Sequence, residues 1–161
     1  MILIATPNES RATHWHQALK GHTFSNREVF NRRQLNLALK KYRIEVLLLD
    51  MGLLGEEGVN DISALHDIRP ETKIILLTET FKPRDELSAV LFGAKAYLDE
   101  SIDPQLLAKV VKRVQEGEIW VDRMFVSRLL KEIEEITKAQ HLEAKEIEKG
   151  IASMTLREEQ I

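Results

Sequence analysis

An aspartate at the end of an apolar run is the residue best placed to do chemistry in this sequence. The stretch VLLLDMGLLGEEG covers Val46–Gly58, and in it Asp50 follows four aliphatic residues and precedes Gly52, Gly55 and Gly58. A glycine loop after a buried strand can hold a phosphate group through main-chain N–H groups. Alternatively, the carboxylate at the strand end can itself be the reacting group.

The three glycines do not match a phosphate-binding loop. A Walker loop needs G-x-x-x-x-G-K-[ST] and a dinucleotide loop needs G-x-G-x-x-G, and neither pattern occurs here. In addition, Glu56 and Glu57 would repel a phosphate. We therefore interpret the glycines as turn formers ahead of a helix, and Asp50 remains the candidate functional residue.

Other chemical groups give weaker patterns. His14 and His16 are two residues apart in a predicted helix, so they point to different faces and do not form a metal-binding pair. No Ser-His-Asp spacing is informative, and we expect no catalytic residues, no enzyme activity and no cofactor. The chain has no cysteine, which excludes disulfides and thiolate zinc sites.

The charge balance argues against direct binding of nucleic acid by this stretch of chain. The net charge of the 161 residues is -3 and the pI is about 6.0. Two basic clusters, at residues 31–34 and 39–43, are short and lie in predicted helices. This pattern is typical of the solvent-exposed face of a helix and not of a nucleic-acid-binding patch. No apolar run reaches the ~18 residues of a membrane span, and the N-terminus has no signal-peptide pattern. We expect a soluble cytoplasmic protein with no membrane partner.

The elements that must position Asp50 form an alternating pattern. Short continuous apolar runs predict buried parallel strands, at Ile2–Ala5, Val46–Leu49, Ile74–Leu77 and Ala96–Leu98, with a weaker run at Phe24–Val29. Helical patterns lie between these runs, and Asp103 with Pro104 predicts the start of the last of them. This order predicts a doubly wound α/β sheet with helices on both faces. In such sheets, function lies at the carboxyl ends of the strands.

A long charged helix is predicted at 123–149. Val126, Leu129, Ile133 and Ile136 follow a 3-4-3 spacing, which is an a/d seam of two heptads. Such a stripe can pack on the chain's own domain, or it can form a dimer linker or a spacer, and the sequence leaves these alternatives open.

A capping box is present near the end of the sequence. Thr155 with Glu158 predicts that a new helix begins there, only a few residues before the chain stops. We therefore expect the sequence to be a piece of a longer protein.

Taken in order, several segments resemble a known family. VLLLDMGLLGEEG, KIILLTE, FGAKAYL and GEIWVD resemble a response-regulator receiver domain of the LuxR/NarL/FixJ class, with a flavodoxin-like (βα)5 fold. MTLREEQI resembles the opening of the LuxR-type helix-turn-helix. The resemblance implies a receiver-like domain at 1–120, a helical linker at 121–152 and the start of a DNA-binding domain at 153–161.

The resemblance also implies roles for single residues. Asp50 matches the phosphoacceptor aspartate, Thr78 matches the hydroxyl residue that contacts the phosphoryl group, and Tyr97 matches the aromatic switch position. Leu54 stands where the family usually has proline.

The sequence departs from the family where charge is required. Thr6 and Pro7 occupy the positions of the acidic pair that holds Mg²⁺, and Glu100 occupies the position of the lysine that pairs with the phosphoryl oxygens. Asp50 alone would be a weak metal site, with Glu9 as a weak substitute ligand. Because phosphoryl transfer depends on metal and cationic charge, we expect a degenerate receiver controlled without standard phosphorylation.

The function implied is transcriptional regulation. Expected partners are DNA through a further domain, a second copy of the chain, and a sensor kinase or another protein. Two alternatives stay open: a receiver phosphorylated on Asp50 through an unusual Mg²⁺ site, and a stand-alone protein-interaction module. An enzyme that binds nucleotides is less favoured because no phosphate loop is present.

Overall fold

The computed structural model describes residues 1–21 and 25–159, with side chains up to residue 149. It separates into two units, Met1–Asp122 and Arg123–Ile161. The first unit contains five strands, β1 (Ile2–Ala5), β2 (Asn26–Val29), β3 (Val46–Asp50), β4 (Lys73–Thr78) and β5 (Ala94–Asp99). Its α-helices are α1 (Glu9–Leu19), α2 (Arg32–Lys41), α3 (Ile62–Ile68), α4 (Pro83–Leu91) and α5 (Pro104–Gln115), with 3-10 turns η1 (Met51–Leu53) and η2 (Gly58–Asp61).

The strands form one parallel sheet in the order β2-β1-β3-β4-β5. The chain therefore crosses from β2 past β1 to β3, so the carboxyl ends of β1 and β3 are neighbours. Ala5 pairs with Leu49, the residue before Asp50. This arrangement confirms the predicted doubly wound sheet and places Thr6 beside Asp50.

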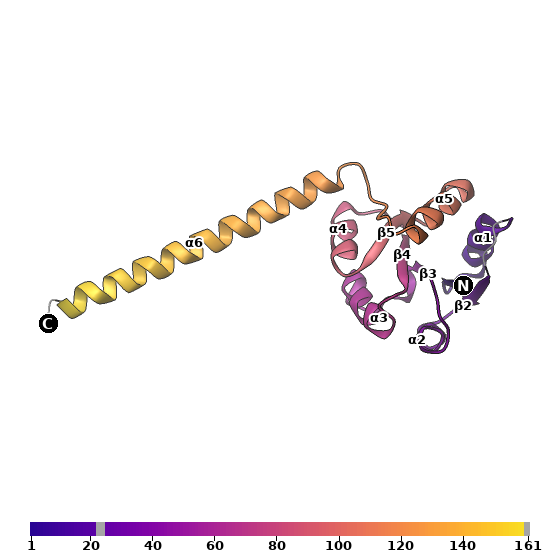
Figure 1. The fold of residues 1–161 in the computed structure, drawn as a ribbon, viewed down its shortest axis with the longest axis horizontal. Coiled ribbons are helices and arrows are strands. Elements are labelled where there is room, and N and C mark those ends of the chain that lie inside the picture. Colours follow the sequence, from indigo (N-terminus) through magenta and orange to yellow (C-terminus); the bar gives the residue numbers. More distant parts are fainter. Residues whose placement is uncertain (22–24, 160–161) are drawn as a thin grey trace. The chain divides into compact units, whose positions relative to one another are not determined.

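Helices cover both faces of the sheet, as Figure 1 shows. On one face, the sheet packs against α2, α3 and α4 through residues such as Leu35, Ile62 and Ala89. On the other face it packs against α1 and α5 through Trp15 and Val111, among others. Because the central strands are buried on both sides, they need the continuous aliphatic runs seen in the sequence.

Local signals set the helix boundaries. The Asn8 side chain accepts a hydrogen bond from Arg11 N (3.1 Å) and caps α1, and Asp103 caps α5 ahead of Pro104. Helix α1 ends at Leu19 ahead of Gly21, whose φ of +86° favours glycine. The predicted strand at Phe24–Val29 is observed as Asn26–Val29, and Phe24 lies outside the described residues.

The second unit contains one helix, α6 (Phe125–Glu159). Of the seam residues, Val126, Ile133 and Ile136 are 50 to 60% exposed, and Leu129 is half-buried. Helix α6 runs through Thr155, so the predicted start of a separate helix at that residue is wrong. The reason is that a capping box acts only where the chain leaves the preceding helix, and no glycine or proline beside Thr155 forces it to do so. The assignment of 153–161 to a DNA-binding domain stays a prediction, and residues 160 and 161 lie outside the described range.

Within the described residues, every helix falls short of the length or the apolar character that a membrane crossing requires.

Candidate functional site

The Asp50 side chain is buried at the carboxyl end of β3 and receives three hydrogen bonds. Its Oδ2 atom accepts from the Thr6 hydroxyl (2.6 Å) and from Arg11 Nη1 (3.0 Å). Its Oδ1 atom accepts from Gly52 N (2.8 Å), the first turn of η1. Gly52 is suited to this position because a Cβ there would lie 3.2 Å from Asp50 Oδ1. Asp50 therefore sits in a fully formed set of donors rather than in an open site.

Thr6 links Asp50 to the start of α1. Its hydroxyl donates to Asp50 and accepts from Asn8 N (3.2 Å), and Thr6 is itself buried. Thr6 occupies a position where the family resemblance implies an acidic residue. In this chain the position holds a neutral hydroxyl group that donates to Asp50. The adjacent Pro7 is exposed and has no N–H to offer.

Arg11 is the cation of the site. Capping by Asn8 starts α1 directly after β1, and this places Arg11 on the third helical residue, above the strand ends. Its guanidinium contacts Asp50 through Nη1 (3.0 Å) and Glu100 Oε2 through Nε (2.5 Å). Glu79 Oε2 lies farther off, 3.9 Å from Nη2, on a side chain that is mostly exposed.

Glu100 thus takes part in the site through an ion pair to Arg11. It follows β5, at the position where the family resemblance implies lysine. Its main chain is also fixed, because the buried Trp15 of α1 donates from Nε1 to Glu100 O (3.1 Å) and Glu100 N donates to Thr78 O (2.8 Å). A single arginine on α1 therefore joins carboxylates from the ends of β3 and β5.

The electrostatics of the site hold this arginine charged. Partial burial opposes the charge of Arg11, but the hydrogen bond and the charge of Asp50, together with Glu100 and Glu79, raise its pKa above the ordinary value. One positive group faces three carboxylates, so the site as a whole stays acidic. An approaching phosphate anion would meet net negative charge.

Thr78 and Tyr97, the two switch-like positions, lie on the neighbouring strands. The Thr78 hydroxyl is within hydrogen-bonding distance of Thr80 O (3.2 Å) and Thr80 N (3.3 Å), so it is engaged in its own loop. Tyr97 is buried, with its ring centroid 5.0 Å from that of Phe81, and its hydroxyl accepts from Lys82 N (3.3 Å). Burial raises the pKa of the Tyr97 phenol, and Asp85 and Glu86 add to this effect.

These residues do not fit a Mg²⁺ site. Magnesium binding relies on carboxylates free to coordinate, whereas both Asp50 oxygens are already bound to hydrogen-bond donors and Arg11 adds a positive charge. Among the residues that the structure describes, no group of three or more His, Cys, Asp or Glu side chains could hold a metal ion. Glu9, the weak substitute ligand, is an exposed residue at the start of α1, and its proposed role stays a prediction.

Arg11 is the functional residue that sequence reasoning missed. The available signal was its position, three residues after the Asn8 cap and five after Thr6. Because an arginine side chain is long, a residue in the first turn of α1 can reach back over the strand ends. Arg11 can therefore supply a positive charge to Asp50 although it lies outside the strand-end positions themselves.

Comparison with known proteins agrees with this architecture. A family model described as the response regulator receiver domain matches residues 2–112. The oxygen regulatory protein NreC of Staphylococcus aureus is 35% identical over 94 residues, which cover 57% of this chain and 43% of NreC. The chain thus spans less than half the length of this relative.

Solved structures share the fold at low identity. A LuxR-family two-component response regulator from Aurantimonas sp. SI85-9A1 has a TM-score of 0.68 at 14% identity, covering 81% of this chain and 95% of that one. The isolated receiver (REC) domain of RcsB from Salmonella enterica serovar Typhimurium has a TM-score of 0.67 at 20% identity, covering 80% and 96%. With the family model spanning most of the sheet and its helices, the chain belongs to the response regulator receiver domain family.

Proposed function

We propose that this chain is the regulatory receiver of a LuxR-type DNA-binding transcriptional regulator, and that it works without standard phosphorylation of Asp50. The family and the likeness to NreC support the signalling role. DNA would be bound by a domain beyond the residues described, and a sensor kinase or another protein would be the upstream partner. The role is one of signalling rather than of catalysis.

The observation that carries this proposal is the bridge of Arg11 between Asp50 and Glu100. A phosphorylatable aspartate needs open carboxylate oxygens and cations that can neutralise the incoming phosphoryl group. Here the cation comes from within the chain and is already neutralised by two carboxylates. Arg11 would therefore hold Asp50 and Glu100 in one fixed arrangement.

Control would then act through other contacts. The surface that receivers of this family use for regulation corresponds to residues 85–114, which include most of α4, all of β5 and most of α5. A partner on this surface, or a change in dimerisation, would pass the signal on without a change at Asp50.

Dimerisation through α6 is part of the proposal. The seam of Val126, Leu129, Ile133 and Ile136 would bury its exposed apolar atoms against a second copy of the helix. The double variant Ile133→Asp with Ile136→Asp should shift the mass measured by sedimentation toward the monomer. Replacing the exposed Lys131 and Lys138 by aspartate is the control, and an unchanged mass in the seam variant would exclude a coiled-coil dimer.

The experiment that tests the unphosphorylated site is a titration with Mg²⁺ followed by beryllofluoride, which mimics a phosphoryl group. Melting temperature and amide NMR shifts of Asp50, Thr78 and Tyr97 are the readouts. We expect no saturable change in the natural chain. A saturable shift that Asp50→Ala abolishes would contradict the proposal.

That second result would support the alternative of a phosphorylatable receiver. The observation in its favour is that Asp50 keeps its place at the end of β3, where it pairs with Leu77, the residue before Thr78 on β4. In that case Mg²⁺ would have to displace Arg11 from Asp50. Incubation with acetyl phosphate and Mg²⁺, followed by mass spectrometry, would show a phosphoryl group on Asp50.

A further inference from the structure

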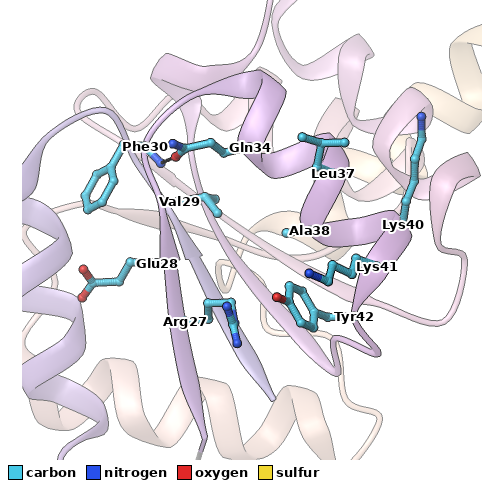
Figure 2. A pocket seen from close by; sticks show the side chains of 10 residues that line it. All are labelled: Arg27, Glu28, Val29, Phe30, Gln34, Leu37, Ala38, Lys40, Lys41 and Tyr42. Carbon is cyan, nitrogen blue, oxygen red and sulfur yellow. Dashed lines mark hydrogen bonds between the residues drawn. The ribbon is translucent and has the colours of Figure 1, made fainter.

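A groove runs along the open edge of the sheet, away from Asp50. It lies between β2 and α2, has a volume of about 630 Å³, and is drawn in Figure 2. Its lining residues are Arg27, Glu28, Val29, Phe30, Gln34, Leu37, Ala38, Lys40, Lys41 and Tyr42. Neither the family resemblance nor the Asp50 site accounts for this groove.

The first observation is the free strand edge. Strand β2 ends the sheet and pairs with β1 alone. Ile2 N donates to Ser25 O (2.8 Å) and Thr6 N donates to Val29 O (3.1 Å), so the odd-numbered residues face β1. Because main-chain groups alternate along a strand, the N–H and C=O groups of Asn26 and Glu28 point away from the sheet. They form a template for an added strand.

The second observation is the charge of the groove. Arg27, Lys40 and Lys41 supply three positive charges against the single negative charge of Glu28. The Arg27 guanidinium carbon lies 4.2 Å from the centroid of the Tyr42 ring and the Lys41 ammonium lies 5.3 Å from it. Figure 2 shows the side chains of Arg27 and Lys41 close to that of Tyr42. These cations are held in place against an aromatic ring, where they can meet acidic side chains.

The third observation is the apolar wall. Leu37 on α2 is 57% exposed and Phe30 is 37% exposed, and both line the groove beside Val29 and Ala38. Val29 and Ala38 also belong to the buried core on this face, so the wall is continuous with the interior. Such a wall would take an apolar side chain that points inward from a bound strand.

We propose that this groove binds an extended acidic peptide segment of a partner protein, which adds to β2 as an extra strand. Main-chain pairing with Asn26 and Glu28 would give affinity. On the strand face that is turned to α2, an acidic side chain would meet Arg27 and Lys41, and an apolar side chain two positions along would pack on Leu37, because side chains alternate between the two faces of a strand. The proposal does not rest on the state of Asp50, so either can fail without the other.

The test begins with selection of random dodecapeptides by display on the full chain. We expect enriched peptides to carry Asp or Glu and an aromatic or branched residue two positions apart, so that both face α2, and to lack proline in the middle. Failure to enrich any peptide, or enrichment of basic peptides, would overturn the proposal.

The best peptide is then measured by fluorescence anisotropy against matched variants. Arg27→Gln with Lys41→Gln should weaken binding roughly tenfold or more, because both cations leave the groove. Lys109→Gln with Lys112→Gln removes the same charge from the exposed side of α5, and binding should change by less than about twofold. Equal losses in both variants would mean that the peptide responds only to overall charge, and the assigned site would be wrong.

Main-chain pairing is tested on the peptide, so that no variant of the chain needs to fold. N-methylation of one alternate set of peptide amides should weaken binding by about tenfold or more, since it removes hydrogen bonds to β2. Methylation of the other set, which points to solvent, should be tolerated. If neither set matters, the groove holds its ligand by side chains alone, as a small aromatic acid would bind, and strand addition is excluded.

Discussion

Arg11 Nη1 lies 3.0 Å from Asp50 Oδ2, an oxygen that already accepts a hydrogen bond from Thr6 at 2.6 Å. Arg11 of α1 thereby pairs with the aspartate at the end of β3, and its Nε atom lies 2.5 Å from Glu100 Oε2. A cation of the chain itself thus pairs with two of the carboxylates at this end of the sheet. This relationship leads to the first three predictions.

Arg11→Gln should make the site responsive to metal. Without the guanidinium, the buried Asp50 carboxylate loses its cation, and we expect a loss of stability of roughly 2–4 kcal/mol. Millimolar Mg²⁺ should then raise the melting temperature of the variant but leave that of the natural chain unchanged. Arg84→Gln, an exposed arginine on α4, is the matched control. A metal response of equal size in the natural chain would show that Arg11 does not block cations.

Glu100→Lys should destabilise the chain more than Glu100→Gln. The neutral variant removes one partner of Arg11, whereas lysine also adds repulsion, and we expect a loss of about 2–3 kcal/mol for lysine in urea unfolding. Glu79→Lys serves as comparison, because Glu79 lies 3.9 Å from Arg11 and is 78% exposed. Its effect should stay within about 0.5 kcal/mol.

The double variant Arg11→Gln with Glu100→Lys separates charge from packing. If the site requires one cation near Asp50, the new lysine can supply it. The double variant should then lose less stability than the sum of the losses of the two single variants. Additive losses would mean that the arginine is required for its shape and not for its charge.

Asp61 should make the stability depend on acid pH. Arg32 donates hydrogen bonds to Asp61 from two nitrogens, and these bonds lower the pKa of Asp61 below its ordinary value of 3.8. Partial burial opposes this shift, and a hydrogen bond from Gly55 N adds to it. A lowered folded-state pKa gives stability that is present above pH 3.8 and is lost as the pH falls toward the folded value. Asp61→Asn should cost about 1–3 kcal/mol at pH 7. Urea unfolding at a series of pH values gives the free energy of unfolding of the natural chain and of the variant. The difference between the two free energies should shrink below pH 3.8, and a constant difference would contradict the ion pair.

Gly93→Ala should be more harmful than Gly117→Ala. Both glycines have positive φ, +119° and +95°, so alanine strains the backbone in each case, by about 1–2 kcal/mol. At Gly93 the new Cβ would also lie 2.7 Å from His66 Cδ2, whereas at Gly117 it would meet nothing within 4 Å. Thermal unfolding of the two variants gives the comparison. A further variant, Gly93→Ala with His66→Ala, should recover the part of the loss that the clash causes.

The sequence by itself determined the sheet, because continuous aliphatic runs such as Val46–Leu49 are stable only when both faces of a strand are covered. It also determined the start of α5, since Asp103 and Pro104 act within one turn of chain. Asp50 was found for the same reason, as the polar residue that ends a buried run. These signals are local, and neighbouring residues carry all of the information.

Only the tertiary structure decided what Asp50 contacts. Its partners Thr6 and Arg11 lie 44 and 39 residues away in the sequence, and Glu100 follows a strand that is two strands away in the sheet. The crossover that places β1 beside β3 brings them together, and the Asn8 cap then fixes the turn of helix from which Arg11 reaches. The physical reason is that a long side chain is directed by the packing of α1 on the sheet, which no local pattern around Asp50 records.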